Sequence, residues 1–197
     1  MSRTAAYLTL MSCGAAAALP GYVLAFAGRQ RRLAANTLIS SRLREGFLLL
    51  FWMFCGGMAA VTLTPRWVAE LVRSGDWAEG HAPFFQWGSV SLVPLETFAA
   101  DAHSIYILLG NIILFLPFGF LAALLWRGYH GKRSLLLGVG ISGGIECWQL
   151  TVGRTFDVDD LLLNTLGVLT GFLLWKLSDK VLPKGLRQLH CTEREIV

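Results

Sequence analysis

The sequence predicts an all-α protein: a polytopic transmembrane helical bundle of about five spans, with the N-terminus outside and the C-terminus inside. Hydrophobic residues make up 54% of the 197 residues and charged residues only 15%. The mean hydropathy is +0.55. These values are typical of membrane proteins and exclude an ordinary soluble domain. The apolar residues gather in long segments, and the basic residues flank them.

The apolar segments have the length that a membrane requires. A helix needs roughly 20 residues to cross a hydrocarbon core of about 30 Å. The expected spans are residues 5–27, 46–64, 104–126, 134–150 and 158–176. The fourth is the shortest and holds Glu146 near its end, so a four-span alternative with a re-entrant 134–150 stays open. Pro20 and Pro117 would each bend their helix, which neighbouring helices must accommodate.

The distribution of Lys and Arg predicts the orientation. Basic residues cluster in 29–44, 127–133 and 176–194, whereas the region 65–103 and the short turn near Arg154 carry few. Loops rich in Lys and Arg tend to remain cytoplasmic. The three basic regions are therefore expected inside and the other loops outside, in the bacterial cytoplasmic membrane. The clusters flank apolar spans, so they do not indicate a nucleic-acid partner.

The first span could instead be a signal peptide, since AFAG at 25–28 resembles a cleavage site. Only Arg3 precedes the apolar run and a basic cluster follows it, which favours an uncleaved helix. We expect an N-terminal helix and basic loop (1–45), a membrane domain (46–176) and a basic tail (177–197). The four cysteines and four histidines lack ligand spacing, so neither a metal nor a cofactor is expected. The sequence does not indicate an oligomeric state.

The outer region 65–103 is rich in aromatic residues. Trp67, Trp77, Phe84, Phe85 and Trp87 are of the kind that lies at the headgroup level. Part of this region, near 84–99, is expected on the membrane surface as a short amphipathic or re-entrant piece. It would either anchor the chain or cover a site.

Polar residues mark the start of the fifth expected span. On a helix beginning near residue 157, intervals of three and four place one set of side chains on a single stripe: Asp157, Asp160, Asn164, Gly167 and Gly171. Gly167 and Gly171 form a small-xxx-small pair that allows close helix packing. Asp159 falls off the stripe and is expected to face water.

The fourth span brings further polar groups to the same end. Glu146 and Gln149 share a helix face, and Arg154 occupies the short turn that makes the last two spans antiparallel neighbours. Asn111 in the third span would lie at a depth similar to Asn164. The predicted site is thus an outer-leaflet polar cluster of Asn111, Glu146, Gln149, Arg154, Asp157, Asp160 and Asn164.

Ionisable groups within a membrane cost about 2.5–3.5 kcal/mol each on insertion scales, so they usually face a partner or a wet cavity. A purely structural interpretation pairs Arg154 with Glu146 or Asp157 and lets the asparagines bond between helices. One arginine can neutralise only one of at least three carboxylates. The remaining negative charge could be balanced by a cation, by protonation or by a ligand.

Four blocks together resemble the VanZ-like membrane proteins: SLVPLETF (91–98), NIILFLPFGFLAALL (111–125), IECWQ (145–149) and GRTFDVDDLLLNTLGVLTG (153–171). The resemblance covers roughly 46–176. It implies that the family's characteristic positions carry over to Asn111, Pro117, Gly119, Glu146, Gln149, Arg154, Asp157, Asp160, Asn164 and Gly167. The first span and its basic loop look less characteristic. The family's founding member is associated with low-level resistance to teicoplanin, a glycopeptide that acts at the outer face of the membrane.

Three hypotheses follow. The first is a non-enzymatic protein whose outer-leaflet pocket binds an amphiphilic ligand, a lipid or a lipoglycopeptide, with Arg154 on its anionic group. The resemblance implies that such a protein would act in teicoplanin-type resistance or in envelope maintenance. The second is an intramembrane enzyme acting on a phosphorylated or polyprenyl lipid, with Glu146 or Asp157 as general base and Asp160 as a ligand for Mg²⁺. The third is a structural helix-packing core.

Overall fold

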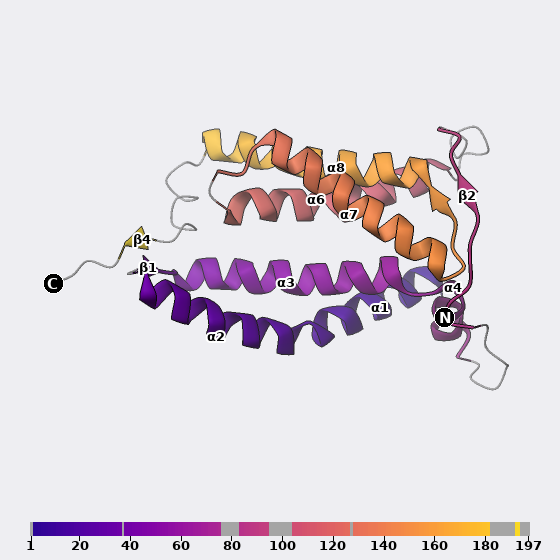
Figure 1. Ribbon diagram of the computed structural model, residues 1–197, viewed down its shortest axis with the longest axis horizontal. Coiled ribbons are helices and arrows are strands. Elements are labelled where there is room, and N and C mark those ends of the chain that lie inside the picture. Colours follow the sequence, from indigo (N-terminus) through magenta and orange to yellow (C-terminus); the bar gives the residue numbers. More distant parts are fainter. Residues whose placement is uncertain are drawn as a thin grey trace.

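The computed structural model describes residues 2–36, 38–75, 83–94, 104–126, 128–181 and 192–193, and its fold is all-α as predicted (Figure 1). Its helices are α1 (Arg3–Ala17), α2 (Leu19–Ala35), α3 (Arg42–Leu63), α4 (Arg66–Ser74), α6 (Ser104–Leu125), α7 (Gly131–Thr151) and α8 (Val158–Val181). Strand β1 (Leu38–Ile39) pairs antiparallel with β4 (Thr192–Glu193). Strand β2 (Val90–Ser91) pairs parallel with β3 (Phe156–Asp157).

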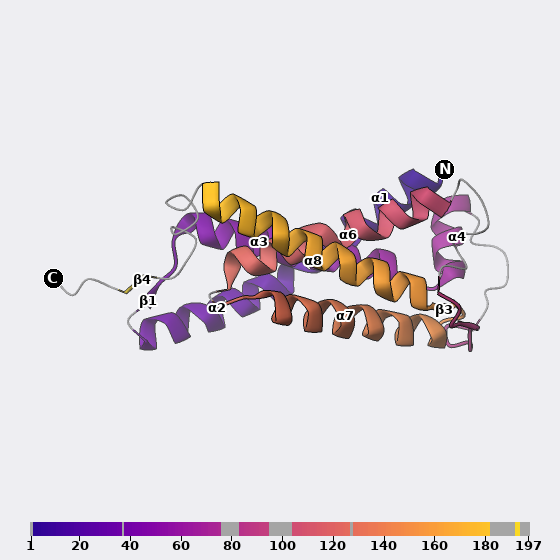
Figure 2. The ribbon, with the colours of Figure 1, turned by 90° about the horizontal axis from the view of Figure 1, so that it is seen from above.

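Four stretches of the described residues are long and apolar enough to cross a membrane: Thr4–Ala35, Arg42–Leu63, Leu108–Leu125 and Val158–Val181. Helix α7 is not among them, although its 21 residues almost equal the 22 of α3. It includes Lys132, Arg133 and Glu146, which lower its hydropathy. The fourth expected span is therefore a continuous helix that lies alongside α8 (Figure 2), and the number of crossings stays a prediction.

The first helical stretch is longer than its apolar core. It was expected to end at residue 27 but continues to Ala35, with a break at Ala18 between α1 and α2. Pro20 lies in the first turn of α2, where its missing N–H costs no helical hydrogen bond. The Trp52 indole N–H donates to the Ala18 carbonyl oxygen at 2.6 Å. Trp52 of α3 thus contacts the backbone at the break between α1 and α2.

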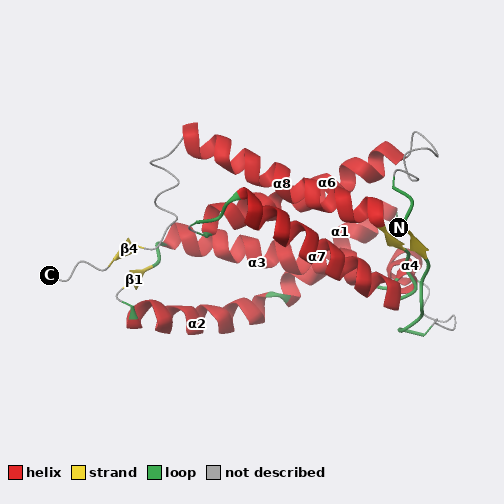
Figure 3. Cartoon of the chain, turned by 45° about the horizontal axis from the view of Figure 1, so that its top comes forward, coloured by secondary structure: helices red, strands yellow, loops and turns green. Residues whose placement is uncertain are grey.

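Helices α1 and α2 run in the same direction as one broken stretch, and α3, α6, α7 and α8 then alternate in direction, so the connections gather at two ends of the bundle (Figures 1 and 3). The start of α1, helix α4 and the β2–β3 pair lie at one end, which we call the polar-site end. Strand β1, the start of α7 and the last turn of α8 lie at the other, which we call the basic end. The described parts of the loops expected outside are at the polar-site end, and those of the loops expected inside are at the basic end. Which end faces the cytoplasm stays a prediction.

Helices α6 and α8 make the closest packing in the bundle. A methyl group at Gly167 would lie 2.6 Å from the Ile112 carbonyl oxygen and 3.0 Å from the Phe115 Cβ. Methyl groups at Gly119 and Gly171 would also collide with backbone atoms of the facing helix. Phe115 and Val168 beside this contact are fully buried. The small residues therefore let the two backbones touch, as the small-xxx-small pattern predicted.

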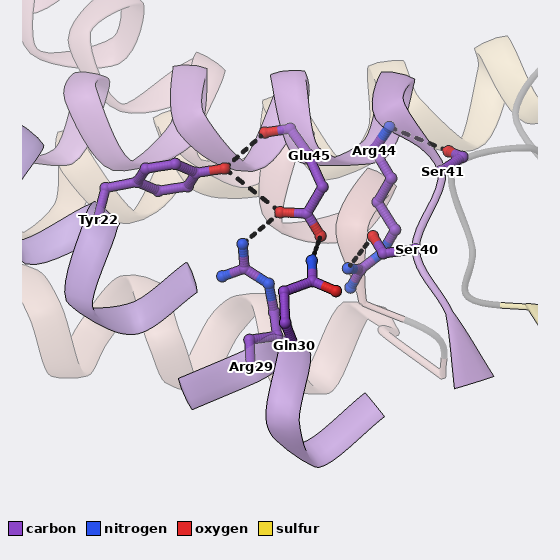
Figure 4. Close-up of polar contacts among 7 residues, drawn as sticks. All are labelled: Tyr22, Arg29, Gln30, Ser40, Ser41, Arg44 and Glu45. Carbon is purple, nitrogen blue, oxygen red and sulfur yellow. Dashed lines mark hydrogen bonds and ion pairs between the residues drawn. The ribbon is translucent and has the colours of Figure 1, made fainter. Parts of the chain in front are cut away.

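A polar cluster at the basic end joins α2 to α3 (Figure 4). Glu45 forms an ion pair with Arg29, and its carboxylate also accepts hydrogen bonds from Tyr22 at 3.3 Å and Gln30 at 3.5 Å. The Tyr22 hydroxyl also donates to the Glu45 carbonyl oxygen at 3.1 Å. These contacts fix the N-terminal helices to the rest of the bundle where basic residues are densest.

The aromatic outer region has two parts in the structure. Helix α4 follows α3 directly, and residues 84–94 are extended rather than helical, with a bridge from Gln86 to Val152. Phe85 and Trp87 are largely exposed, as expected of side chains at a membrane surface. Trp77, residues 95–99 and most of the basic tail lie outside the described residues.

The packing of α6 on α8 gives a matched pair of variants. Gly167→Ala should destabilise the bundle by about 1–3 kcal/mol because the new methyl meets backbone. Gly140→Ala on α7 meets nothing within 4 Å and should be neutral or stabilise by up to about 1 kcal/mol through helix propensity. Equilibrium unfolding in mixed micelles measures both. Equal stability of the two variants would contradict the close contact.

Candidate functional site

The turn between α7 and α8 builds the polar-site end. Gly153 has a φ of +76°, which only glycine adopts readily, and it reverses the chain after α7. Asp157 then precedes α8, and its Oδ1 accepts a hydrogen bond from the Asp159 N–H at 2.8 Å. This is an N-cap interaction, and it begins the helix at Val158.

Glu146 fixes this turn to α7. Its side chain is only 1% exposed, and Oε2 accepts a hydrogen bond from the Asp157 N–H at 3.0 Å. A carboxylate that bonds a main-chain N–H satisfies a buried donor as well as holding the two segments together. Glu146 and Asp157 are therefore neighbours as predicted, but they meet through the backbone of β3.

A hydrogen-bond network joins α6, α7 and α8. The Asn111 amide on α6 donates to the Asp160 carboxylate on α8. The Asn164 amide donates to the Ser142 hydroxyl at 3.0 Å, which in turn donates to the Asp160 carbonyl oxygen at 3.5 Å. The asparagines thus bond between helices, as the structural interpretation expected. Ser142 was not singled out from the sequence, because a serine within an apolar helix usually bonds its own backbone.

Arg154 and Gln149 converge on the end of α3. Gln149 Nε2 donates to the Thr62 carbonyl oxygen at 2.9 Å, and an Arg154 guanidinium N–H donates to the same oxygen at 3.2 Å. The last carbonyls of a helix lack partners within it and attract positive charge. Arg154 forms no ion pair with a carboxylate of the described residues, so the expected pairing with Glu146 or Asp157 is absent there.

The prediction that Asp159 faces water is wrong. This residue is 2% exposed and has interactions within the fold. Asp159 lies in the first turn of α8, directly after β3, which pairs with β2, a strand far away in the sequence. Helical periodicity within α8 could not reveal that pairing.

A pocket of about 330 Å³ opens beside these groups. Four predicted site residues line it: Gln149, Arg154, Asp157 and Asp160. Its remaining lining residues come from α1, the end of α3, α4 and the turn: Ala6, Tyr7, Leu10, Val61, Thr64, Ala69, Glu70, Arg73 and Thr155. The structure thus gathers into one wall residues that are far apart in the sequence.

The walls from α1 and α4 were not anticipated from the sequence. Helix α4 supplies Glu70 and Arg73, which pair with each other at 2.6 Å. Its sequence, RWVAELVRS, alternates apolar and charged positions at helical spacing, and this signal could have placed it against the bundle. Nothing in the apolar sequence of α1 marks Tyr7 as a lining residue.

The charges around the pocket are unequal. Glu70 and Arg73 offset each other, which leaves Arg154 opposite Asp157 and Asp160. One oxygen of each of these two carboxylates accepts a hydrogen bond from the protein: Asp157 from the Asp159 N–H and Asp160 from the Asn111 amide. Arg154 uses one guanidinium N–H on Thr62. The pocket therefore presents both spare donors and spare acceptors. Within the described residues, no three His, Cys, Asp or Glu side chains form a metal-binding group.

The fold and this site define a helical membrane protein with a polar pocket at one end of its bundle. The VanZ/LLP1 family model matches residues 47–179, which is most of the chain, and the protein belongs to this family. The matched region begins within α3 and includes the whole polar network, while α1 and α2 precede it. Neither the comparison with curated proteins nor that with solved structures gave a match.

The role of Glu146 can be tested with two replacements of similar size. Glu146→Gln keeps an oxygen that accepts from the Asp157 N–H, so stability should fall by no more than about 1 kcal/mol. Glu146→Leu leaves that N–H without an acceptor and should cost about 1–3 kcal/mol. Thermal unfolding in detergent compares them. A Gln variant as unstable as the Leu variant would show that the charge, rather than the hydrogen bond, stabilises the turn.

Proposed function

We propose that this VanZ-like membrane protein binds an amphiphilic ligand, a lipid or a lipoglycopeptide, in the pocket at its polar-site end. Arg154 contacts the anionic group of that ligand. The observation that supports this most is the position of Arg154: it lines a pocket of about 330 Å³, and the one described hydrogen bond of its side chain goes to the Thr62 carbonyl oxygen.

The chemistry of Arg154 favours an anion. A guanidinium group carries five N–H donors in a plane and bonds phosphate or carboxylate in a bidentate manner. Its hydrogen bond to Thr62 holds the side chain in place without neutralising it. A preorganised arginine loses less conformational entropy when a ligand binds. Gln149, bonded to the same carbonyl oxygen, supports the arrangement.

The surroundings of the pocket favour an amphiphile. Tyr7, Leu10 and Val61 give it an apolar side, and Asp157 and Asp160 give it a polar one. Phe85 and Trp87, exposed at the same end, are suited to the headgroup region. A lipid-like molecule can place its headgroup in the pocket while its chain remains in the membrane.

The membrane and the face on which the pocket opens are part of the same proposal. The basic loops at the opposite end favour a bacterial cytoplasmic membrane with the pocket facing outward. A ligand site there is where a glycopeptide such as teicoplanin, or a cell-envelope lipid, would be met. Teicoplanin-type resistance or envelope maintenance is therefore the process proposed for this protein.

Native mass spectrometry of the purified protein tests the ligand. Arg154→Ala should lower retention of a co-purified anionic lipid or of added teicoplanin at least about tenfold, because a hydrogen bond to a charged group contributes about 1.5–3 kcal/mol. Arg31→Ala removes the same charge from exposed α2 and should retain the ligand like the wild type.

Three results would count against the proposal. One is equal retention by wild type and Arg154→Ala. Another is loss of the fold in Arg154→Ala, seen as a collapse of its thermal transition, which would support a structural role. The third is Mg²⁺-dependent conversion of a bound phosphorylated lipid, which would favour an intramembrane enzyme instead.

A further inference from the structure

A second pocket, of about 590 Å³, lies toward the basic end. Helices α3, α6 and α7 and the loop between the last two supply its lining: Phe51, Phe118, Ala122, Trp126, Tyr129, Arg133, Leu136 and Leu137. None of these residues lines the pocket that holds Arg154. The two sites share no residue and lie toward opposite ends of the bundle.

The walls of this second pocket are aromatic and aliphatic. The Phe51 ring lies 5.4 Å from that of Phe118 and 5.3 Å from that of Trp126, measured between centroids. Leu136 is 62% exposed and Leu137 is 41% exposed. In a membrane, exposed leucines on a helix of the bundle face lipid chains. The pocket is therefore reached from the lipid-facing surface.

One charged side chain lines this apolar pocket. Arg133 lies in the first turn of α7, where its guanidinium donates to the Gly128 carbonyl oxygen at 3.2 Å. His130 caps the same turn by accepting from the Arg133 N–H at 3.4 Å. Arg133 forms no ion pair with any carboxylate in the described part of the chain, and no acidic residue lines the pocket. A held but uncompensated arginine thus stands beside an apolar space.

We propose that this second pocket binds an anionic phospholipid, with an acyl chain against Phe51, Phe118 and Leu137 and the phosphate on Arg133. Charge complementarity selects the occupant: an unpaired guanidinium without a neighbouring carboxylate matches a net negative headgroup better than a zwitterionic one. Basic pockets between helices on the cytoplasmic side are known to hold such headgroups. Trp126 and Tyr129 flank the site with side chains suited to the membrane interface.

The position in the chain supports this choice. Lys132 and Arg133 begin α7, and the last turns of α8 add Lys176 and Lys180. These charges raise the local concentration of anionic lipid at this end. Only Arg133 among them lines the pocket, so it should distinguish specific binding from general attraction.

Titration of the detergent-purified protein with dioleoyl phosphatidylglycerol, followed by native mass spectrometry, tests the proposal. Dioleoyl phosphatidylcholine serves as the zwitterionic comparison. The wild type should bind the former more tightly. Arg133→Gln should weaken that binding at least about tenfold, because it removes the charged donor that bonds the phosphate. Lys132→Gln, which removes an adjacent exposed charge outside the pocket, should stay within about twofold of the wild type, because solvent screens an exposed charge.

A second matched pair keeps the proposal testable if Arg133→Gln fails to fold. Leu137→Trp fills the pocket and should abolish retention of phosphatidylglycerol, whereas Leu135→Trp, on the exposed surface of the same helix, should leave it intact. Arg133→Gln should weaken phosphatidylglycerol binding by the same factor in the wild type and in an Arg154→Ala background, because the two pockets share no residue.

Equal binding of the two lipids by the wild type would overturn the proposal. So would an equal effect of Arg133→Gln and Lys132→Gln, which would indicate unspecific attraction. A change in oligomeric state in Leu137→Trp with lipid retention unchanged would assign the surface to a second copy of the chain instead.

Discussion

The contact of α6 with α8 is the constraint on which the remaining structure depends. Glycines at 119, 167 and 171 let the two backbones touch, and without a hydrophobic driving force in lipid such close packing is a main source of helix association. Because the helices lie this close, Asn111 reaches Asp160, 49 residues further along the chain. The register of α8 then places its first turn, and hence Asp157, beside Glu146 of α7.

Most of the polar residues of the site make hydrogen bonds that hold this arrangement together. Glu146 and Asp157 satisfy main-chain N–H groups at the turn, while Gln149 and Arg154 satisfy the Thr62 carbonyl at the end of α3. Buried polar groups without partners would be costly in this setting. Arg154 and the two aspartates, Asp157 and Asp160, line the pocket and keep further hydrogen-bonding capacity beyond these contacts. A structural role of these residues is therefore compatible with the ligand binding that we propose for the same pocket.

The helices were predictable because an apolar segment of membrane length can satisfy its backbone hydrogen bonds in lipid in few other ways. The expected 46–64 became Arg42–Leu63, and 158–176 became Val158–Val181. Their ends were less predictable, since basic residues such as Arg31 and Arg32 continue a helix as readily as they end it. The gathering of Gln149, Arg154, Asp157 and Asp160 also followed from the short turn. The partner of Arg154 did not, because it is a main-chain carbonyl, and a main-chain group leaves no mark in the sequence. The contribution of α4 was not predictable either, because α4 meets the other pocket residues only through the tertiary fold.

We propose that the pocket beside Arg154 opens at the outer face of the membrane. Cysteine labelling in intact cells tests this most directly, in a background with Cys13, Cys55, Cys147 and Cys191 replaced by serine. Thr155 lines the pocket and is exposed. Thr155→Cys should react with a membrane-impermeant maleimide from outside, whereas Lys176→Cys at the basic end should react only after permeabilisation. The reverse pattern, or no reaction of Thr155→Cys until the membrane is broken, would contradict an outward-facing site.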